Sequence, residues 1–384
     1  MTSQISRTGQ INDPRVLILS LRNINIFGKD LFRCSHYEFE DIIRTIDFAE
    51  LFAPKLESSN IRYRLTGQLA TRAPVILKPG ITKLMSKSRY DILFTICGFP
   101  QDLLVVNTIG DLRSICKKSV CLIDEFWLTQ LVKYRHYFRI LSKFDVVMLY
   151  YSKTVKPLSE QIDSRCVFLP PGIDAILFSP YPNPPERVVD VYSIGRRSEV
   201  THQRLLRMVQ ESDLFYLHDS IGGHLAINSK EHRTLFANIA KRSRYFLVNP
   251  GKMDLPDVRG NQIEVSNRYF EGAASGTIMI GERPTNEVFE KLFDWPEAVI
   301  QLPYDSGRID RIIKDLDGDP TRQDSIRRAN VIHILKHHDW VYRWETVLNA
   351  VGLEPMQGLL QRKERLWKLA EVVSQDGQIS SVAG

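Results

Sequence analysis

Short apolar segments rich in β-branched residues alternate along this chain with longer segments of helical spacing, such as residues 128–142. In the first half the apolar segments are VLILS (16–20), DILFTI (91–96), VCLI (120–123), VVMLYY (146–151) and CVFLP (166–170). Strands that are apolar throughout and separated by helices are typical of a parallel sheet covered on both faces. The pattern therefore predicts an α/β fold.

A proline-rich segment, SPYPNPPERV (179–188), interrupts this alternation. Closely spaced prolines cannot continue a helix or a central strand, so we interpret it as a stiff linker. The alternation then resumes with VVDVYSIG (188–195), DLFYLH (213–218), RYFLVN (244–249), TIMI (277–280) and AVIQL (298–302). Because 384 residues exceed one ordinary core, we predict domains over residues 1–180 and 186–350, with a further helix over 355–375 crossing back.

Composition narrows the class of protein. No apolar run approaches the ~18 residues that span a bilayer, and the first residues, MTSQISRTGQ, lack a signal-peptide core. The five cysteines form no CxxC pair, which favours a cytoplasmic chain with reduced, buried thiols. The net charge of +6 is compatible with an anionic ligand, and we expect no nucleic-acid partner.

The helix expected at residues 359–373, LLQRKERLWKLAEVV, places Leu359, Leu366, Ala370 and Val373 on one face. We favour packing of this face against the two domains. Lys and Arg flank Leu and Trp in the same segment, so peripheral binding at the inner face of a membrane remains the alternative.

The segment VYSIGRRSEVTHQRLL (191–206) indicates a strand, a glycine turn and a helix. Gly195 permits a tight turn, and Arg196 and Arg197 would stand at the carboxyl end of the strand. An anionic group there gains from the helix terminus and from a forked guanidinium. The alternative is two solvated turn arginines. Neither a P-loop nor a dinucleotide fingerprint accompanies them.

A second candidate segment is NRYFEGAASGTIMI (267–280). If residues 263–275 are helical, Glu264, Arg268, Glu271 and Ser275 share one face. The simpler interpretation is an exposed Glu–Arg pair, worth ~0.3–0.5 kcal/mol to the helix. The functional interpretation is a carboxylate that accepts two hydrogen bonds from a vicinal diol such as a ribose.

Three segments resemble one superfamily. VFLPPGIDAILFSP (167–180) resembles the segment that ends the first domain of GT-B glycosyltransferases, and SNRYFEGAASGTIMI (266–280) resembles their donor-site helix. The second has the form found in group-1-like proteins related to the spore-maturation protein CgeB. RRANVIHILKHHDWVYRWETVL (327–348) resembles the closing helices of that group.

The resemblance implies a GT-B fold, in which two Rossmann-like domains face each other across a cleft and C-terminal helices pack back on the N-terminal domain. The first domain would bind the acceptor and the second the nucleotide-sugar donor. Glu271 falls on the glutamate that holds the ribose hydroxyls, and Arg196 on the arginine that neutralises the diphosphate. Glu264 is the candidate for the family's second glutamate, which would bind a hydroxyl of the sugar. The family's two glutamates are separated by seven residues, whereas Glu264 and Glu271 have six between them. The family's usual lysine is not evident, and His202 or Arg204 would stand in for it.

On the first domain, Gly28 lies in a polar loop after the first strand and could bring backbone amides to the diphosphate or the acceptor. Asp124 and Glu125 follow another strand, and one of them could act as general base for an acceptor hydroxyl. Turn chemistry and helix capping are the structural alternatives.

Two further segments resemble a metal-binding motif and a nucleic-acid-binding motif, but we interpret both as ordinary structural features. The Asp-x-Asp spacing in DLDGD (315–319) suits a divalent cation, but it precedes a proline, so we interpret it as a surface turn and expect no metal. KYRHYFR (133–139) interleaves basic and aromatic residues as a nucleic-acid groove does. We favour a helix with a wet basic face.

These observations lead to one principal hypothesis. The protein would be a retaining, metal-independent hexosyltransferase (EC 2.4) without a cofactor, which moves a sugar from a UDP- or GDP-sugar to a glycan, lipid-linked or small-molecule acceptor. The alternatives are a nucleotide-sugar epimerase or phosphorylase on the same fold, and a non-catalytic nucleotide-binding or scaffold protein.

Overall fold

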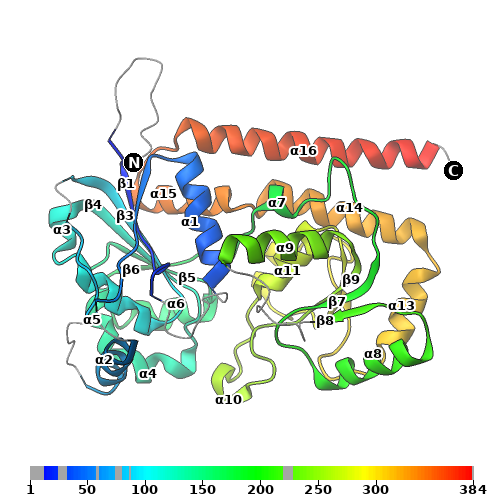
Figure 1. The fold of residues 1–384 in the computed structure, drawn as a ribbon, viewed down its shortest axis with the longest axis horizontal. Coiled ribbons are helices and arrows are strands. Elements are labelled where there is room, and N and C mark those ends of the chain that lie inside the picture. Colours follow the sequence, from blue (N-terminus) through cyan, green and yellow to red (C-terminus); the bar gives the residue numbers. More distant parts are fainter. Residues whose placement is uncertain are drawn as a thin grey trace. The chain divides into compact units, whose positions relative to one another are not determined.

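The computed structural model describes residues 13–24, 33–57, 60–73, 80–85, 88–218 and 228–382. It divides into two compact units, which Figure 1 shows as two sheets with their helices. Unit 1 comprises residues 1–170 and 344–361, and unit 2 comprises residues 171–343 and 362–384. Each unit contains one parallel sheet flanked by helices, so the predicted α/β class is confirmed.

Unit 1 is built on a six-stranded sheet in the order β2-β1-β3-β4-β5-β6. Its strands are β1 (Val16–Leu19), β2 (Ala49–Phe52), β3 (Tyr90–Cys97), β4 (Cys116–Ile123), β5 (Val146–Leu149) and β6 (Arg165–Phe168). In β1, Val16 lies opposite Ala49 on one side and Ile92 on the other, both in parallel pairing. Because β1 pairs with β2 on one side and with β3 on the other, the carboxyl ends of β1 and β3 form a topological switch point, where ligands of open α/β sheets bind.

The helices of unit 1 are mostly short. They are α1 (Cys34–Ile46), α2 (Asn60–Arg72), η2 (Pro100–Thr108), α3 (Leu112–Ile115), η3 (Leu128–Gln130), α4 (Leu131–Tyr134), η4 (Arg135–Tyr137), α5 (Phe138–Leu141) and α6 (Ser152–Ser159). The helical spacing over residues 128–142 therefore belongs to four short pieces. The chain returns to this unit at Trp344, whose ring lies 5.4 Å from that of Phe94 and whose Nε1 donates to Asp47 Oδ2 at 2.9 Å.

Unit 2 contains a five-stranded parallel sheet in the order β11-β10-β9-β7-β8. Its strands are β7 (Val189–Ser193), β8 (Tyr216–His218), β9 (Ser243–Val248), β10 (Ile278–Gly281) and β11 (Ile300–Gln301). Its helices are α7 (Ala175–Phe178), α8 (Glu199–Glu211), α9 (Ser229–Lys241), α10 (Pro256–Arg259), α11 (Asn267–Ala274), α12 (Glu287–Leu292), α13 (Ile309–Asp317) and α14 (Pro320–His337). Because β7 pairs with β8 on one side and with β9 on the other, the switch point lies at the carboxyl ends of β7 and β9.

The proline-rich segment 179–188 is not the linker between the two units that the sequence predicts. The first unit ends at residue 170, ten residues before the predicted boundary, and the prolines lie within unit 2. Arg187 fastens the segment there by donating to the carbonyls of Ser243 (2.6 Å) and Gly276 (2.7 Å). These hydrogen bonds explain why the segment packs along the unit.

The two C-terminal helices are α15 (Trp340–Val351) and α16 (Gln357–Val382). On α16 the side chains of Leu359, Leu366, Ala370 and Val373 are fully buried, so the predicted apolar face packs against protein. None of the helices in the described residues combines the length and apolar character needed to cross a bilayer.

All five cysteines are free, and every one except Cys166 is buried. Burial raises the pKa of Cys116 to about 11, so its thiol stays protonated at neutral pH and is a poor nucleophile. The expectation of largely buried thiols is confirmed.

Candidate functional site

Helix α11 begins later than the sequence predicts. It runs from Asn267 to Ala274, and Gly276, with a φ of +62°, ends it in the left-handed region. Glu264 lies before the helix in a non-helical segment, where its carboxylate accepts from Gln262 at 2.6 Å and its backbone carbonyl accepts from Gly251. The prediction that Glu264 shares a helical face with Arg268 and Glu271 is therefore wrong, because these contacts hold Glu264 outside the helix.

Glu271 lies at the centre of a buried ion-pair cluster. Arg233 of α9 donates to Glu271 Oε1 at 2.5 Å, and Arg268 pairs with Oε2. Burial alone would raise the pKa of Glu271, but the charges and hydrogen bonds of Arg268 and Arg233 lower it below its usual value. The Glu271 side chain is 3% exposed. Its contact with a ribose stays a prediction, because arginines engage both of its oxygens here.

Arg268 connects this cluster to the glycine turn after β7. Gly195 has a φ of +82°, and the position of a Cβ there would lie 3.5 Å from Arg268 Nη2. The guanidinium also lies 5.2 Å from the centre of the Phe236 ring. Unlike Arg233, whose side chain is 4% exposed, that of Arg268 is 31% exposed. The Arg268 guanidinium is therefore held by the buried Glu271 carboxylate and is partly exposed to solvent at the switch point of unit 2.

The two arginines of the turn after β7 have different environments. Arg196 is half exposed, and its Nη1 lies 2.5 Å from Asp254 Oδ2. The backbone carbonyl of Arg197 accepts a hydrogen bond from Tyr304 Oη at 3.1 Å. The helix that follows begins with Ser198 as its N-cap. The predicted order of strand, glycine turn and helix is confirmed here.

The predicted substitutes for the missing lysine are engaged elsewhere on α8. His202 Nδ1 lies 2.9 Å from Tyr216 Oη, on the side of the helix that faces β8. Arg204 pairs with Asp310 of α13 at 2.7 Å. Both side chains thus link α8 to the neighbouring elements β8 and α13. Their contact with a diphosphate stays a prediction.

Two residues of α9, Arg233 and His232, belong to the cluster but were not singled out from the sequence. Burial, followed by the charges of Arg233 and Arg268, lowers the pKa of His232. A usable signal did exist: Arg233 occupies the buried stripe of α9 with Phe236, Ala237 and Ala240, at helical spacing. A charged residue within an apolar stripe indicates a buried partner.

In unit 1, the structure places Asp124 at the carboxyl end of β4. His36 Nε2 of α1 lies 2.7 Å from Asp124 Oδ2, and the side chains are 2% and 20% exposed respectively. The position of a Cβ on Gly98, which follows β3, would lie 3.5 Å from His36 Cε1. Asp124 and His36 therefore meet beside the switch point of unit 1.

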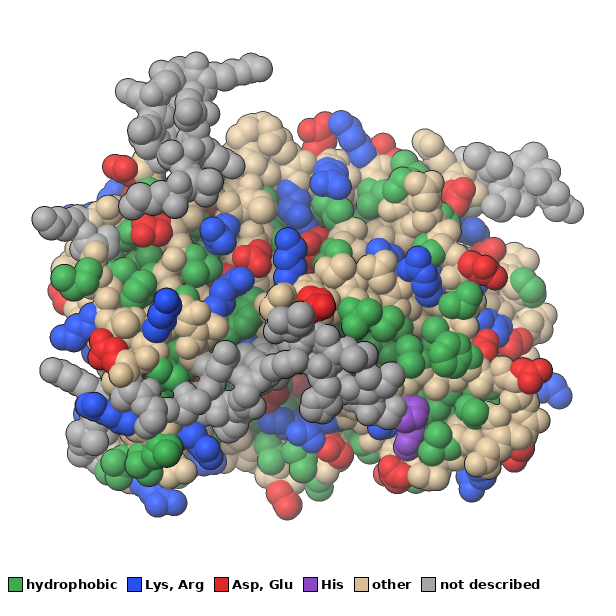
Figure 2. Space-filling view, viewed as in Figure 1, with side chains coloured by type: hydrophobic (Ala, Val, Ile, Leu, Met, Phe, Trp, Pro, Cys, Tyr) green, Lys and Arg blue, Asp and Glu red, His purple; other side chains and the backbone are tan. Residues whose placement is uncertain are grey.

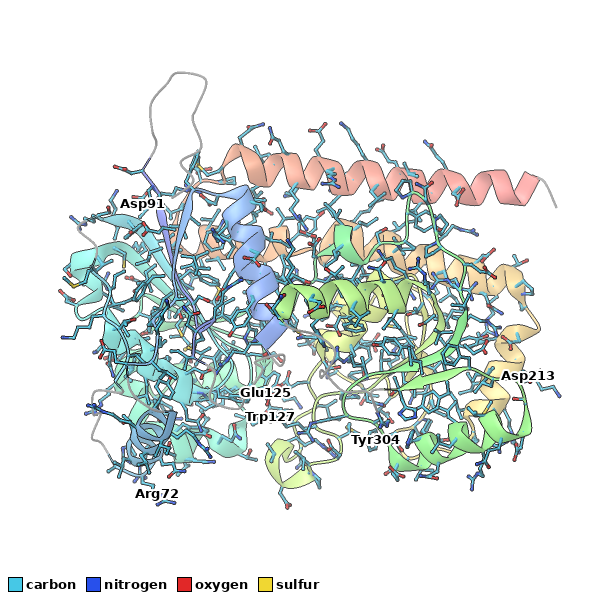
Figure 3. The ribbon with its side chains drawn as sticks, viewed as in Figure 1. Arg72, Asp91, Glu125, Trp127, Asp213 and Tyr304 are labelled. Carbon is cyan, nitrogen blue, oxygen red and sulfur yellow. The ribbon has the colours of Figure 1, made fainter. Side chains whose placement is uncertain are left out.

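Two further predicted residues lie in or near this region of unit 1. Glu125 is half-buried next to Asp124, and Figure 3 shows it near Trp127. Gly28 falls outside the described residues.

The acidic segment 315–319 has structural partners. Asp317 accepts from Arg244 and Tyr245, and Asp319 caps α14 by accepting from the Arg322 amide at 2.9 Å. In the part of the chain that the structure describes, no three His, Cys, Asp or Glu side chains gather as metal ligands.

Comparison with known proteins gives a family match for residues 187–349 and a fold for the chain. Residues 187–349 match the family described as glycosyl transferase-like. An α-glucosyltransferase solved with UDP and a 13-mer DNA containing a HMU base is 12% identical, with a TM-score of 0.51 over 88% of this chain and 99% of that one. No curated protein matches the chain.

Two other solved structures are similar at lower scores. A glycosyltransferase from Rickettsia africae ESF-5 is 11% identical, with a TM-score of 0.47 over 88% of this chain and 98% of that one. A UDP-N-acetylglucosamine 2-epimerase is also 11% identical, with a TM-score of 0.48 over 90% and 99%. The fold assignment rests on the α-glucosyltransferase, whose TM-score is above 0.5.

Two Rossmann-like α/β units, each with its own switch point, define the GT-B fold, and the chain has this fold. Residues 187–349 match the model of the glycosyl transferase-like family. The resemblance drawn from the sequence is confirmed at this level, and the relation to CgeB within it stays a prediction.

Proposed function

We propose that the protein transfers a sugar from a UDP- or GDP-sugar to an acceptor hydroxyl, with retention of anomeric configuration and without a metal ion. The observation that carries the proposal is the placement of Arg268. Its guanidinium lies beside the Gly195 turn, at the switch point where nucleotides bind in such sheets. The match of residues 187–349 to a glycosyl transferase-like family supports the same chemistry.

The chemistry requires stabilisation of a leaving group. As the bond between the anomeric carbon and the diphosphate breaks, negative charge accumulates on the diphosphate oxygens. A guanidinium held in place by Glu271 can stabilise that charge without reorganising, which is the most effective form of electrostatic catalysis. We assign this role to Arg268, with Arg196 as a second cation whose present partner is Asp254.

Donor binding tests the proposal directly. A panel of UDP, GDP and their sugars should contain a nucleotide that raises the unfolding temperature, because ligand at about 100 times its Kd stabilises by ~2.7 kcal/mol. We expect Arg196→Gln to lower the affinity for that nucleotide about tenfold, because the variant lacks one exposed cation. The matched control is Arg207→Gln, an exposed arginine further along α8. Equal affinities of wild type and Arg196→Gln would remove Arg196 from the site.

The acceptor side of the proposal concerns Asp124. We propose that its carboxylate, oriented by buried His36, accepts the proton of the acceptor hydroxyl. Asp124→Asn should lower kcat by about a hundredfold or more, the range of general-base contributions, while the nucleotide-induced thermal shift stays unchanged. Full transfer by Asp124→Asn would mean that the departing diphosphate itself takes this proton.

Retention and metal independence have simple readouts. Proton NMR of the first product formed should show the anomeric coupling constant of the donor. Addition of EDTA should leave the initial rate unchanged. An inverted product, or a rate restored only by added Mg²⁺ or Mn²⁺, would contradict the corresponding part of the proposal.

A further inference from the structure

Helix α2 of unit 1 exposes an apolar stripe where a globular helix would bury one. Ile61, Leu65 and Leu69 follow one another at four-residue spacing, and their side chains are 66%, 52% and 48% exposed. The opposite side of the helix provides the packing, with Tyr63, Thr66 and Ala70 buried. Tyr137 fixes this side by donating from Oη to the carbonyl of Gly67 at 3.0 Å. The exposed stripe is therefore a fixed feature of the folded unit.

Basic side chains surround this stripe. Arg62, Arg64 and Arg72 are exposed on the same helix, and within the described residues they form no ion pair. The adjoining α4 and η4 add Val132, which is 74% exposed, and the exposed cations Lys133 and Arg135. In Figure 2, hydrophobic atoms gather over α2 with Lys and Arg beside them, and Figure 3 labels Arg72 at the end of the helix.

The sequence segments that contain these residues carry only positive formal charges. Residues 58–90 contain seven Lys and Arg and no Asp or Glu, and residues 126–144 contain four and again no acid. These two segments carry more positive charge than the whole chain, whose net charge is +6. A concentration of positive charge in these segments favours an anionic partner.

We propose that the α2 surface (Ile61, Leu65 and Leu69 with Arg62, Arg64 and Arg72) binds the surface of an anionic lipid bilayer. The aliphatic side chains would enter the boundary between head groups and acyl chains, while the arginines pair with lipid phosphates. This combination of an apolar stripe and flanking basic residues is that of interfacial helices.

The observations disfavour two other partners. A single-stranded nucleic acid needs aromatic rings on which bases stack, but Tyr134, Tyr137 and Phe138 of the neighbouring basic segment are buried. A second copy of the chain would bring two surfaces of the same sign together, which is repulsive. An anionic bilayer satisfies both the aliphatic stripe and the arginines.

Sedimentation with vesicles tests this surface. The full chain should sediment with vesicles of phosphatidylcholine and phosphatidylglycerol at 70:30 and remain in solution with pure phosphatidylcholine. Each arginine near an anionic surface is worth about fivefold in binding, so the variant Arg62→Gln/Arg64→Gln/Arg72→Gln should bind about a hundredfold more weakly. High salt should release the wild type, since it screens these charges.

Two further variants control the experiment. Leu65→Ser/Leu69→Ser keeps every charge and should also lose binding, at unchanged melting temperature because both side chains are exposed. Arg308→Gln/Arg311→Gln/Lys314→Gln removes three exposed cations from unit 2 and should bind as the wild type does.

Three outcomes would overturn the proposal. They are equal sedimentation with neutral vesicles, unchanged binding of the arginine variant, and retention of a DNA oligonucleotide by the α2 surface without vesicle binding. No nucleotide sugar is present in the assay, so any of these results leaves the proposed sugar transfer untouched.

Discussion

Replacing Arg268 by alanine is expected to lower kcat for sugar transfer by about a hundredfold or more, the typical cost of removing one fixed donor from a developing negative charge. The guanidinium lies beside the Gly195 turn, and buried Glu271 holds it in place. Folding should be little affected, because Arg233 still pairs with Glu271 in the variant. The measurement is the initial rate of product formation with the nucleotide sugar identified by thermal shift.

Two companion variants make this result specific. Arg268→Lys retains the charge but lacks the forked donor geometry, and we expect it to recover only part of the rate. Arg283→Ala removes an arginine that pairs with Glu290 on the surface of the same unit, and should leave the rate unchanged. A fully active Arg268→Ala enzyme would show that the leaving group is stabilised elsewhere.

Replacing Glu271 by leucine is expected to lower the free energy of unfolding by about 3–5 kcal/mol, the usual cost of removing one partner from a buried ion pair. The remaining Arg233 side chain is 4% exposed and would be left as a buried charge without its carboxylate. Urea unfolding followed by circular dichroism measures the change.

The matched control for this loss is the double variant Glu271→Leu/Arg233→Leu. It removes both buried charges, and because such replacements are often neutral, we expect it to be more stable than Glu271→Leu alone. Glu287→Ala, at a carboxylate 91% exposed in its pair with Lys291, should change stability by no more than a few tenths of a kcal/mol. A Glu271→Leu protein as stable as the wild type would contradict the assigned role of the cluster.

The same cluster gives a pH dependence with a defined sign. The pKa of Glu271 is lowered from 4.5 in the folded protein by Arg268 and Arg233, which outweigh the opposing effect of burial. The unfolded state therefore binds the proton more tightly. The stabilisation is complete above about pH 4.5 and is lost as the pH falls through the lower, folded pKa. In Glu271→Leu this part of the acid sensitivity should disappear.

Sequence periodicity predicted the fold class well because it depends on local pattern. The apolar runs at residues 91–96 and 146–151 coincide with β3 and β5, and their burial follows from a sheet covered on both faces. The turn at Gly195 was equally readable, since a strand, a glycine and a capped helix occupy consecutive residues.

Features that depend on contacts between distant residues were not predictable in this way. Helix α11 begins at Asn267 because Ser266 donates to the carbonyl of Asn249 at 2.7 Å and Gly251 donates to that of Glu264. No spacing within residues 263–275 reveals those partners. The pairing of Asp124 with His36, 88 residues apart, is likewise absent from any local pattern.

The sequence by itself determined the alternation of strands and helices, the basic character of residues 58–90 and the positions of the candidate arginines. Only the tertiary structure decided that Arg233 and Arg268 enclose Glu271, and that Ile61, Leu65 and Leu69 remain exposed. The physical reason is that secondary structure follows from neighbouring residues, whereas burial and ion pairing depend on which elements the fold brings together.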